Sequence, residues 1–250
     1  MKEKRQNSQE PVVDIENLKI GFNGNEVLTN ITMQLHEGEN LVVLGRSGCG
    51  KSVLAKCIIG LLRCDEGKVS VLGRNIPELS LTELNELRRK MGYLFQSGAL
   101  YDSMTVRENL GFQLKRINRT LSLADINEKV AEALENVGLI NAADKMPSEL
   151  SGGMRKRIGL ARTIVAEPEI ILYDEPTTGL DPVTSDEISV LINHIKERYK
   201  ASSLIITHDI RCVKMVADRI LMLNNGEVYK SGNPDSFETS GDPFIKQFFK

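Results

Sequence analysis

Hydrophobic and polar positions alternate in the first part of the chain. The alternation covers 12–22 and returns over 27–35, a pattern typical of strands with one buried face. Asn23-Gly24-Asn25 lies between the two stretches and favours a hairpin turn, because Asn and Gly tolerate positive φ angles. The pattern breaks near Asn17. We therefore predict an antiparallel β-meander whose first stretch is divided into two strands near Asn17.

Further along, short continuous apolar runs alternate with segments of helical periodicity. The run at 41–44 indicates a strand buried on both faces, and the apolar spacing over 52–62 indicates a helix. Such alternation implies a parallel sheet with right-handed crossovers. Other strands are predicted at 68–72, 91–95, 170–173 and 203–207, helices at 81–90, 182–199 and 242–249, and a hairpin within 218–230.

The block from Thr105 to Val165 is predicted to be almost entirely helical. Thr105 and Glu108 have the spacing of a capping box. An amphipathic helix is expected over 126–137, with Gly138 at its end. A further helix is predicted over 155–166. We therefore expect an all-helical insert between two parts of the α/β core.

The composition limits the class of protein. The 250 residues suffice for one large α/β domain or two small ones. A net charge of −2 gives no general attraction to nucleic acid, and we expect no such partner. The apolar runs are far shorter than the ~20 residues of a membrane-spanning helix, so a role at a membrane would require a partner protein. The polar first ten residues predict a flexible N-terminus without a secretory signal, and four cysteines without CxxC spacing indicate reduced thiols.

A glycine-rich segment between a predicted strand and a predicted helix carries the strongest chemical signal. It reads Gly45-Arg46-Ser47-Gly48-Cys49-Gly50-Lys51-Ser52 and matches the P-loop pattern. Backbone N–H groups of such a loop cradle phosphates, Lys51 would reach the β- and γ-phosphates, and Ser52 would bind Mg²⁺. The alternative, a simple glycine-rich turn, would produce this pattern by chance in very roughly 1% of chains of this length. The sequence therefore predicts a site for ATP and Mg²⁺.

Two acidic residues follow the apolar strand predicted at 170–173. Asp174 suits the acid that accompanies Mg²⁺ in a P-loop site, and Glu175 is placed to polarise an attacking water. The alternative is an acid pair that caps the following turn. His208 follows another predicted strand, at the edge where open α/β folds bind ligands, and could contact a γ-phosphate. We predict catalytic roles for Lys51, Glu175 and His208.

A second possible anion site lies at Leu150-Ser151-Gly152-Gly153-Met154. Ser151 has the residue type of an N-cap, and the glycines leave backbone donors exposed at the start of a helix. The alternative is an ordinary capped helix. One bound nucleotide would not need two such sites within one chain.

The order of these motifs resembles the ATP-binding cassette (ABC) ATPases. P-loop, Gln96, the LSGGM segment, Asp174-Glu175, Gly179-Leu180-Asp181 and His208 appear in the family's order, from about Val12 to Asn233. The resemblance implies an α/β P-loop NTPase fold with a RecA-like parallel-sheet core, an antiparallel β subdomain and an all-helical subdomain. The expected boundaries are 11–240 for the ABC domain (core and β subdomain 11–95 and 166–240, helical subdomain 96–165), with 1–10 flexible and a terminal helix at 241–250.

The family resemblance also implies a head-to-tail dimer of two copies of this chain. Each ATP would be held between one copy's P-loop and the other copy's Ser151, Gly152 and Gly153, with Asp181 at the inter-subunit loop. Phe22 matches the aromatic residue that stacks on adenine, and Gln96 matches the residue that touches Mg²⁺ and contacts the membrane permease. Two departures stand out: Met154 replaces the usual Gln, and Val53 replaces the usual Thr.

A narrower resemblance concerns the cargo. The segment Phe95–Val106, the Arg155-Lys156-Arg157 run and Asp242-Pro243-Phe244 are similar to the ATPases of MCE-type (mammalian-cell-entry) lipid transporters, such as the maintenance-of-lipid-asymmetry system. This implies phospholipid transport, a permease bound near 96–104, an MCE-domain protein and a small accessory subunit as further partners, and a peripheral position on the cytoplasmic side of the inner membrane. Three alternatives stay open: a transporter of an amino acid, ion or drug, a non-transport ABC ATPase, and a module that holds ATP without hydrolysing it.

Overall fold

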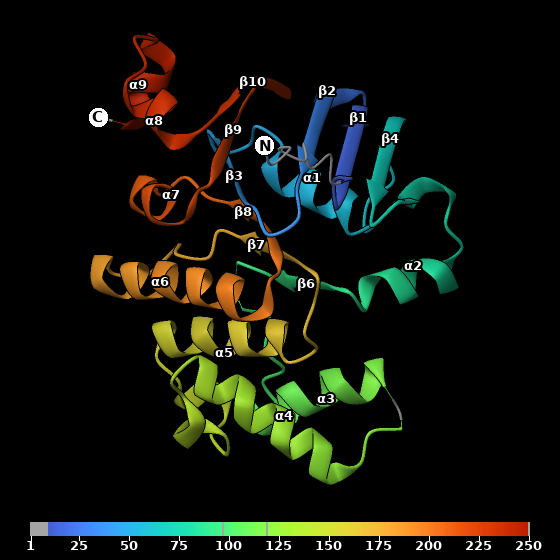
Figure 1. The fold of residues 1–250 in the computed structure, drawn as a ribbon, viewed down its shortest axis with the longest axis vertical. Helices are drawn as coiled ribbons and strands as arrows, with labels where there is room; N and C mark the ends of the chain where they lie inside the picture. The colour runs from blue at the N-terminus through green and yellow to red at the C-terminus, as the bar shows by residue number, and fades with distance from the viewer. Residues whose placement is uncertain (1–9, 97, 119, 250) are drawn as a thin grey trace, which may run out of the picture.

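The computed structural model describes residues 10–96, 98–118 and 120–249. The strands of these ranges form one ten-stranded mixed sheet in the order β5-β4-β1-β2-β10-β9-β3-β8-β7-β6. Figure 1 shows the sheet in the upper half of the molecule and the helices α3, α4 and α5 beneath it. The expected flexible N-terminus at 1–10 falls almost wholly outside the described residues. The observed architecture is the mixed α/β fold predicted from the sequence.

One end of the sheet is the predicted antiparallel meander. It contains β1 (Val13–Phe22), β2 (Asn25–Leu35), β4 (Glu66–Val71) and the short β5 (Arg74–Asn75). The predicted division of the first stretch is wrong, since β1 is a single strand. The irregularity is real nevertheless: Asn17 has a φ of 50°, and the pairing of β1 with β2 shifts register between Ile15 and Leu18. A bulge therefore keeps the strand continuous while it changes which residues face inward.

The rest of the sheet is a parallel core with one hairpin. Strands β3 (Asn40–Gly45), β6 (Met91–Leu94), β7 (Ile170–Asp174), β8 (Ser202–Ile206) and β9 (Arg219–Asn224) run parallel to one another. The predicted hairpin pairs β9 with β10 (Glu227–Gly232). A single pairing of Glu227 with Asn30 joins β10 to the meander. The ends of β3, β7 and β8 consequently lie side by side, because neighbouring parallel strands finish at the same edge.

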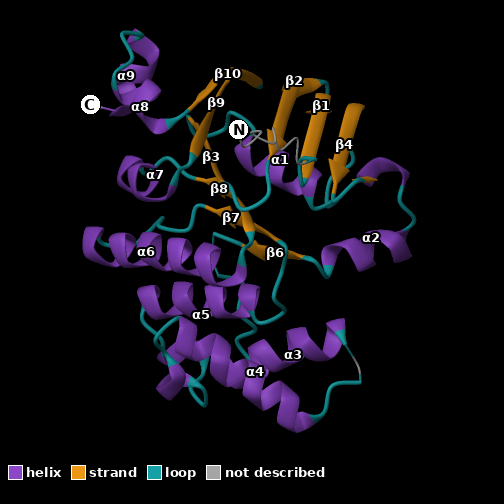
Figure 2. Ribbon diagram, in the orientation of Figure 1, coloured by secondary structure: helices purple, strands orange, loops and turns teal. Residues whose placement is uncertain are grey.

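The helices α3–α6 lie below the sheet, α1 and α2 lie toward the meander, and α8 and α9 lie together near the C-terminus (Figure 2). Helix α1 (Lys51–Ile58) packs beneath the meander, and α2 (Leu81–Arg88) leads into β6. The predicted helical block contains α3 (Val106–Ile117), α4 (Leu123–Asn136) and α5 (Gly152–Ile164), which contact one another, and α5 also packs on α6 (Pro182–Tyr199). The remaining helices are α7 (Ile210–Val216), α8 (Pro234–Glu238) and α9 (Pro243–Phe249), and short 3₁₀ turns occupy 76–78, 140–142 and 147–149.

Capping residues explain several helix boundaries, including those that differ from the predictions. Thr105 forms the predicted capping box with Glu108. Helix α1 ends at Ile58 and not at Leu62, because Gly60 turns left-handed with a φ of 70° and the amide of Leu61 bonds back to the Lys56 carbonyl. Helix α5 begins at Gly152, earlier than predicted, because Ser151 caps it. Helices α7 and α8 were not predicted, since each is shorter than the window in which helical periodicity is visible.

The parallel strands are buried on both faces, as their continuous apolar runs predicted. Alternate residues of β3 enter two different hydrophobic clusters: Val42 and Leu44 contact the cluster under the helices α3–α7, while Leu41 and Val43 contact the cluster under α1 and the meander. The central strands therefore sit between two cores. No described helix is both long enough and apolar enough to span a membrane.

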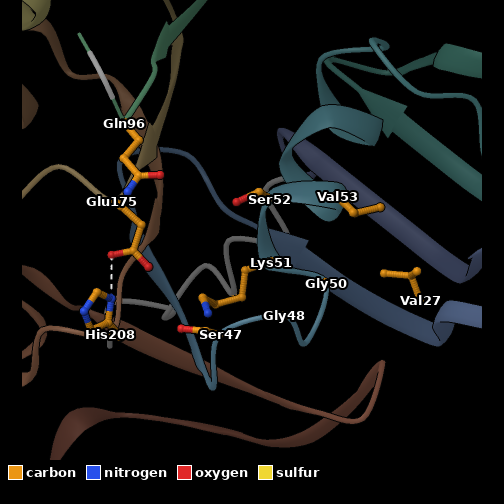
Figure 3. Close-up of a pocket in the computed structure, with 10 residues that line it drawn as sticks. All are labelled: Val27, Ser47, Gly48, Gly50, Lys51, Ser52, Val53, Gln96, Glu175 and His208. Carbon is orange, nitrogen blue, oxygen red and sulfur yellow. Dashed lines mark hydrogen bonds and ion pairs between the residues drawn. The ribbon is translucent and has the colours of Figure 1, made fainter. Parts of the chain in front are cut away.

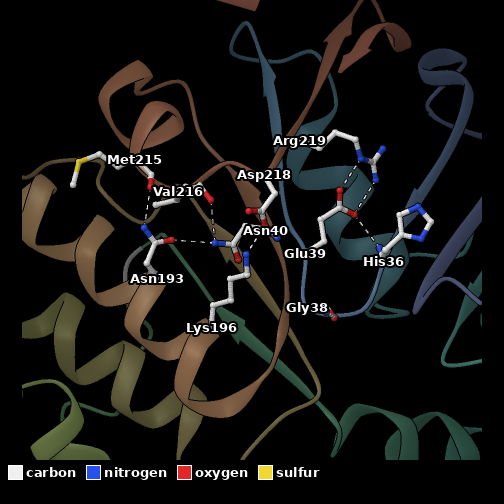
Figure 4. Close-up of polar contacts among 11 residues, drawn as sticks. His36, Gly38, Glu39, Asn40, Asn193, Lys196, Met215, Val216, Asp218 and Arg219 are labelled. Carbon is white, nitrogen blue, oxygen red and sulfur yellow. Dashed lines mark hydrogen bonds and ion pairs between the residues drawn. The ribbon is translucent and has the colours of Figure 1, made fainter. Parts of the chain in front are cut away.

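A buried polar contact fixes the start of the central strand (Figure 4). The fully buried side-chain amide of Asn40 donates to the Val216 carbonyl at 3.0 Å and to the Asn193 amide oxygen at 3.2 Å. The Asn40 backbone N–H donates to Asp218 at 2.7 Å. These bonds tie β3 to α6 and to the connection between α7 and β9.

We expect Asn40→Ala to lower the free energy of unfolding by about 2 kcal/mol, because it leaves the buried Val216 carbonyl without a donor. Urea denaturation measures the change. Asn193→Ala is the matched control: Asn193 is partly exposed, so water can replace its bonds and the loss should stay below about 1 kcal/mol. Equal losses for the two variants would contradict the role assigned to Asn40.

Candidate active site

The glycine-rich loop lies where the sequence predicted it, between β3 and α1. Gly48 and Gly50 have φ angles of 82° and 98°, which side chains with a Cβ rarely adopt. At Gly50 a Cβ would also lie 2.4 Å from a methyl carbon of Leu28. Only glycine therefore fits this last position before the helix, where the loop turns its backbone toward the cavity.

Lys51 is buried and folds over its own loop. Its ammonium donates to the Gly45 carbonyl at 2.8 Å and to the Arg46 carbonyl at 3.0 Å. Burial of a lysine is costly unless its N–H groups find acceptors, and these two carbonyls supply them. The ammonium is thus held beside the loop, ready to exchange carbonyl oxygens for the oxygens of an anionic ligand.

Ser52 and Asp174 meet across the site, although they are 122 residues apart. The Ser52 hydroxyl donates to one Asp174 carboxylate oxygen at 3.0 Å, and the Tyr93 hydroxyl donates to the other at 3.1 Å. Burial, reinforced by the Asp174 charge, raises the pKa of Tyr93 and keeps it a donor. The Ser52 hydroxyl, which lines the cavity, and the Asp174 carboxylate bonded to it are the kinds of oxygen ligand that suit Mg²⁺. The donor set therefore fits the predicted metal.

Glu175 and His208 also meet, from the ends of neighbouring strands. His208 Nδ1 lies 2.8 Å from Glu175 Oε2, and the Thr178 hydroxyl donates to the same oxygen at 3.0 Å. Glu175 has a φ of 52°, in the left-handed region that residues other than glycine seldom occupy. The sequence predicted that both side chains serve the site but did not predict their direct contact.

The two glycines, Lys51, Ser52, Glu175 and His208 line one cavity of about 330 Å³ (Figure 3), whereas Asp174 is not among its lining residues and joins the site through its bond to Ser52. Gln96, Glu175 and His208 stand along one wall, and the loop with Lys51 and Ser52 faces them. Val27 of β2 also lines the cavity, although the sequence predicted it only as part of a strand. The lining residues are Val27, Ser47, Gly48, Gly50, Lys51, Ser52, Val53, Gln96, Glu175 and His208.

Some predicted residues lie around this cavity and not in its wall. Phe22 is 41% exposed at the end of β1, where an aromatic ring is free to stack. The Arg46 side chain turns away toward α9, where it donates to Gln247 at 2.6 Å and lies 5.4 Å from the Phe244 ring centre. Only the backbone of Arg46 can therefore serve a ligand in the cavity in this arrangement.

The LSGGM segment at 150–154, named the signature segment below, lies at a different hollow. Ser151, Gly152 and Gly153 line it together with Asp181. Ser151 caps α5 by accepting from the Met154 amide at 3.2 Å, and Asp181 caps α6 by accepting from the Val183 and Thr184 amides. None of these residues lines the P-loop cavity. Within one copy of the chain, the two predicted anion sites are therefore separate.

Cys49 gives a direct test of where a nucleotide binds. The thiol is partly buried, and burial raises its pKa against the opposing effect of Lys51. In a Cys64→Ser background, we expect maleimide to label Cys49 slowly, faster as the pH rises, and hardly at all with saturating ATP. Mass spectrometry of the intact protein measures the labelling. Cys64 in a Cys49→Ser background should react equally with and without ATP. Equal labelling of Cys49 in both conditions would contradict the assigned pocket.

Comparison with known proteins agrees with this geometry. Residues 28–178, more than half of the chain, match the ABC transporter family model. The "Probable ribonucleotide transport ATP-binding protein mkl" of Mycobacterium leprae is 40% identical over 94% of this chain and 68% of its own length. The chloroplastic protein trigalactosyldiacylglycerol 3 of Arabidopsis thaliana is 37% identical over 97% of this chain and 74% of its own length. The methionine import ATP-binding protein MetN of Carboxydothermus hydrogenoformans is 39% identical over 95% of this chain and 71% of its own length.

Solved structures show the same fold. The ATP-binding cassette MJ0796, in a dimeric post-hydrolysis state bound to ADP and Pi, superimposes with a TM-score of 0.80 at 29% identity, covering 88% of this chain and 98% of that one. The cbiO1 protein of Clostridium perfringens gives a TM-score of 0.83 at 30% identity, covering 90% of each chain. The P-loop cavity, the separate signature segment and these relatives lead to one conclusion. This chain belongs to the ABC transporter family and is an ABC ATPase.

Proposed function

We propose that this chain is the ATPase subunit of an ABC transporter that moves phospholipid through a separate membrane permease. The observation that carries the ATPase part is the cavity in which Lys51 and Ser52 face the Glu175–His208 pair, with Asp174 bonded to the Ser52 hydroxyl. An ammonium, a hydroxyl and two carboxylates are then available for phosphoryl transfer. Catalysis of this reaction consists mostly of positioning the reactants and stabilising charge.

ATP binding would use the loop from Gly45 to Ser52 as the phosphate cradle. The Lys51 ammonium would leave the carbonyls of Gly45 and Arg46 and bind the β- and γ-phosphates. Phe22 would stack on the adenine, and the backbone donors around Gly48 and Gly50 would hold the phosphate chain. Val53 brings no second hydroxyl to this cradle, so the backbone and Ser52 carry the contacts there.

Ser52, Asp174 and Gln96 would hold Mg²⁺. The ion would neutralise charge on the phosphate oxygens during transfer. Tyr93 keeps Asp174 oriented through its 3.1 Å bond. Gln96 comes from the segment after β6 and Ser52 from α1, so the ion would be held between the segment that leads into the helical block and the first helix after the P-loop.

Glu175 would orient the attacking water and take its proton, and His208 would hold the γ-phosphate. Their 2.8 Å contact means that each restrains the other before substrate binds. A carboxylate accepts a proton from water in this role, and correct geometry decides its efficiency. The proton acceptor is thus fixed by two bonds, one from His208 and one from Thr178.

The site would be completed by a second copy of the chain. The hollow with Ser151, Gly152, Gly153 and Asp181 is exposed and lies apart from the P-loop cavity, which supports a role toward a nucleotide held by another molecule. Head-to-tail pairing would place it against the partner's γ-phosphate. ATP binding would then close the dimer and move the permease.

Phospholipid is the proposed cargo because of the Phe95–Val106 segment and its likeness to the ATPases of MCE-type transporters. The Arabidopsis relative is named after a galactolipid, and this name agrees with a lipid cargo. The mycobacterial and Carboxydothermus relatives are named for ribonucleotide transport and methionine import, and such a cargo is the second candidate. The permease would bind near 96–104, on the cytoplasmic side of the inner membrane.

The cargo is tested by purifying the tagged chain from native membranes and identifying its partners by mass spectrometry. A permease together with an MCE-domain protein and a small accessory subunit would support phospholipid. A permease found together with a solute-binding protein would indicate that the cargo is a small solute and not phospholipid. Ribosomal or DNA-repair partners without any membrane protein would overturn the transport role. The untagged strain serves as the control.

A further inference from the structure

Lys156 is a buried charged residue that the steps above do not use. It lies in α5, shortly after the signature segment, and is only 6% exposed. Among the described lysines only Lys51 is buried to the same degree. Burial lowers the pKa of Lys156, and the nearby carboxylates of Glu175 and Asp174 act in the opposite direction. Burying a charged ammonium costs free energy unless its N–H groups donate to specific acceptors.

Its partners are the backbones of two residues that face the cavity. The Lys156 ammonium donates to the Gln96 carbonyl and, at 3.1 Å, to the Glu175 carbonyl. Gln96 follows β6 and Glu175 follows β7, so a single ammonium ties two neighbouring strand ends to α5. Both residues direct their side chains into the P-loop cavity (Figure 3).

The contact explains how Glu175 keeps an unfavourable backbone conformation. Its φ of 52° costs energy in a residue with a Cβ. On one side the Glu175 amide donates to the Ile206 carbonyl at 2.8 Å. On the other side its carbonyl accepts from Lys156. With its amide and its carbonyl both held, Glu175 has a fixed Cα–Cβ direction, and its carboxylate is aimed at His208 and the cavity.

Helix α5 contacts the segment that follows Gln96, here called the Gln96 segment, at Gly98, Ala99 and Tyr101. A Cβ at Gly159 would lie 3.3 Å from the Gly98 backbone. The Arg162 guanidinium donates to the Ala99 carbonyl and lies 5.4 Å from the Tyr101 ring centre. These contacts fasten the segment to α5, and Lys156 also extends from the helix to Glu175. Ser151, at the N-terminus of the same helix, faces the other hollow.

We propose that Lys156 is a positioning residue for ATP hydrolysis. It fixes the backbones of Glu175 and Gln96 against the signature helix, so that the Glu175 carboxylate points at the attacking water. The contact also makes the catalytic carboxylate move with the helix whose N-terminal residues Ser151, Gly152 and Gly153 are proposed to contact the partner copy's nucleotide. This inference rests on the proposed role of Glu175.

The test compares Lys156→Met, Lys156→Gln and the control Arg155→Met. Methionine keeps the length and packing of the side chain but donates no hydrogen bond, glutamine restores two N–H donors, and Arg155 is exposed on the same helix. We expect Lys156→Met to lower kcat about 100-fold, the effect of a small misplacement of a catalytic group, with an unchanged dissociation constant for ATP. Lys156→Gln should recover part of kcat, and Arg155→Met should match the unaltered chain.

Steady-state ATPase kinetics, fluorescent-nucleotide binding and thermal unfolding are measured on the same full-length proteins. An unchanged kcat in Lys156→Met, beside an inactive Glu175→Gln, overturns the positioning role alone. Full activity in Glu175→Gln overturns the proposed role of Glu175 first. If Lys156→Met does not fold, Lys156→Gln decides: loss of ATP binding together with kcat makes the lysine structural, whereas loss of kcat alone supports the proposal.

Discussion

Glu175→Gln is expected to abolish nearly all ATP hydrolysis while ATP binding persists. The amide keeps the shape of the carboxylate but cannot take a proton from water, and loss of general-base catalysis costs about 10²–10⁴-fold in kcat. Because the variant binds ATP without cleaving it, an ATP-bound dimer should accumulate. Phosphate release measures kcat, and size-exclusion chromatography with light scattering detects the dimer.

Glu167→Gln is the matched control for this experiment. Glu167 has the same φ of 52° as Glu175 but lies exposed, paired with Lys129 and outside the cavity. Its variant should hydrolyse ATP at the unaltered rate. Undiminished hydrolysis by Glu175→Gln would show that another group orients the water, and His208 would then be the first residue to examine.

Ser151→Asp should lower kcat about 100-fold or more, because it places a negative charge where the partner's γ-phosphate is proposed to bind. Aspartate caps a helix as well as serine does, so α5 should remain intact. Ser151→Asn is the matched control, since asparagine also caps the helix but carries no charge. It should retain most of the activity, as measured by the same phosphate-release assay.

Mixing variants tests whether the site is shared between two copies. Ser151→Asp and Lys51→Ala should each be inactive alone. An equal mixture should recover about a quarter of the unaltered rate, because half of the random dimers are mixed and each mixed dimer has one intact site. A mixture no more active than its components would contradict the shared site and place the signature segment in another role.

Local patterns in the sequence predicted most of the elements and most of the residues that line the cavity. The P-loop was recognisable because strand, glycines, lysine and serine are consecutive, and the capping box at Thr105 because its two members are three residues apart. Helix α6 has the predicted bounds, since Pro182 and the preceding Asp181 mark its start. Short helices such as α7 escaped prediction because seven residues make too few turns to show a period.

Contacts between distant segments were beyond these patterns. Val27 lines the cavity only because β2 lies near the P-loop, and Lys156, the second of three consecutive basic residues, is buried in the structure. Nothing in the local sequence distinguishes this lysine from its exposed neighbour Arg155. Burial depends on what packs against the helix, and here that is the Gln96 segment.

The sequence by itself determined which groups the site contains, since the residue types and their spacing specify a phosphate loop, two strand-end carboxylates and a capped signature helix. The tertiary structure alone decided which of them meet. Glu175 and His208 are 33 residues apart, yet their side chains touch because β7 and β8 are parallel neighbours that end at one edge. The signature segment remains outside that cavity because it lines a separate hollow with Asp181 and Thr184 at the start of α6. The order of the strands arises from long-range packing, and no local period encodes it.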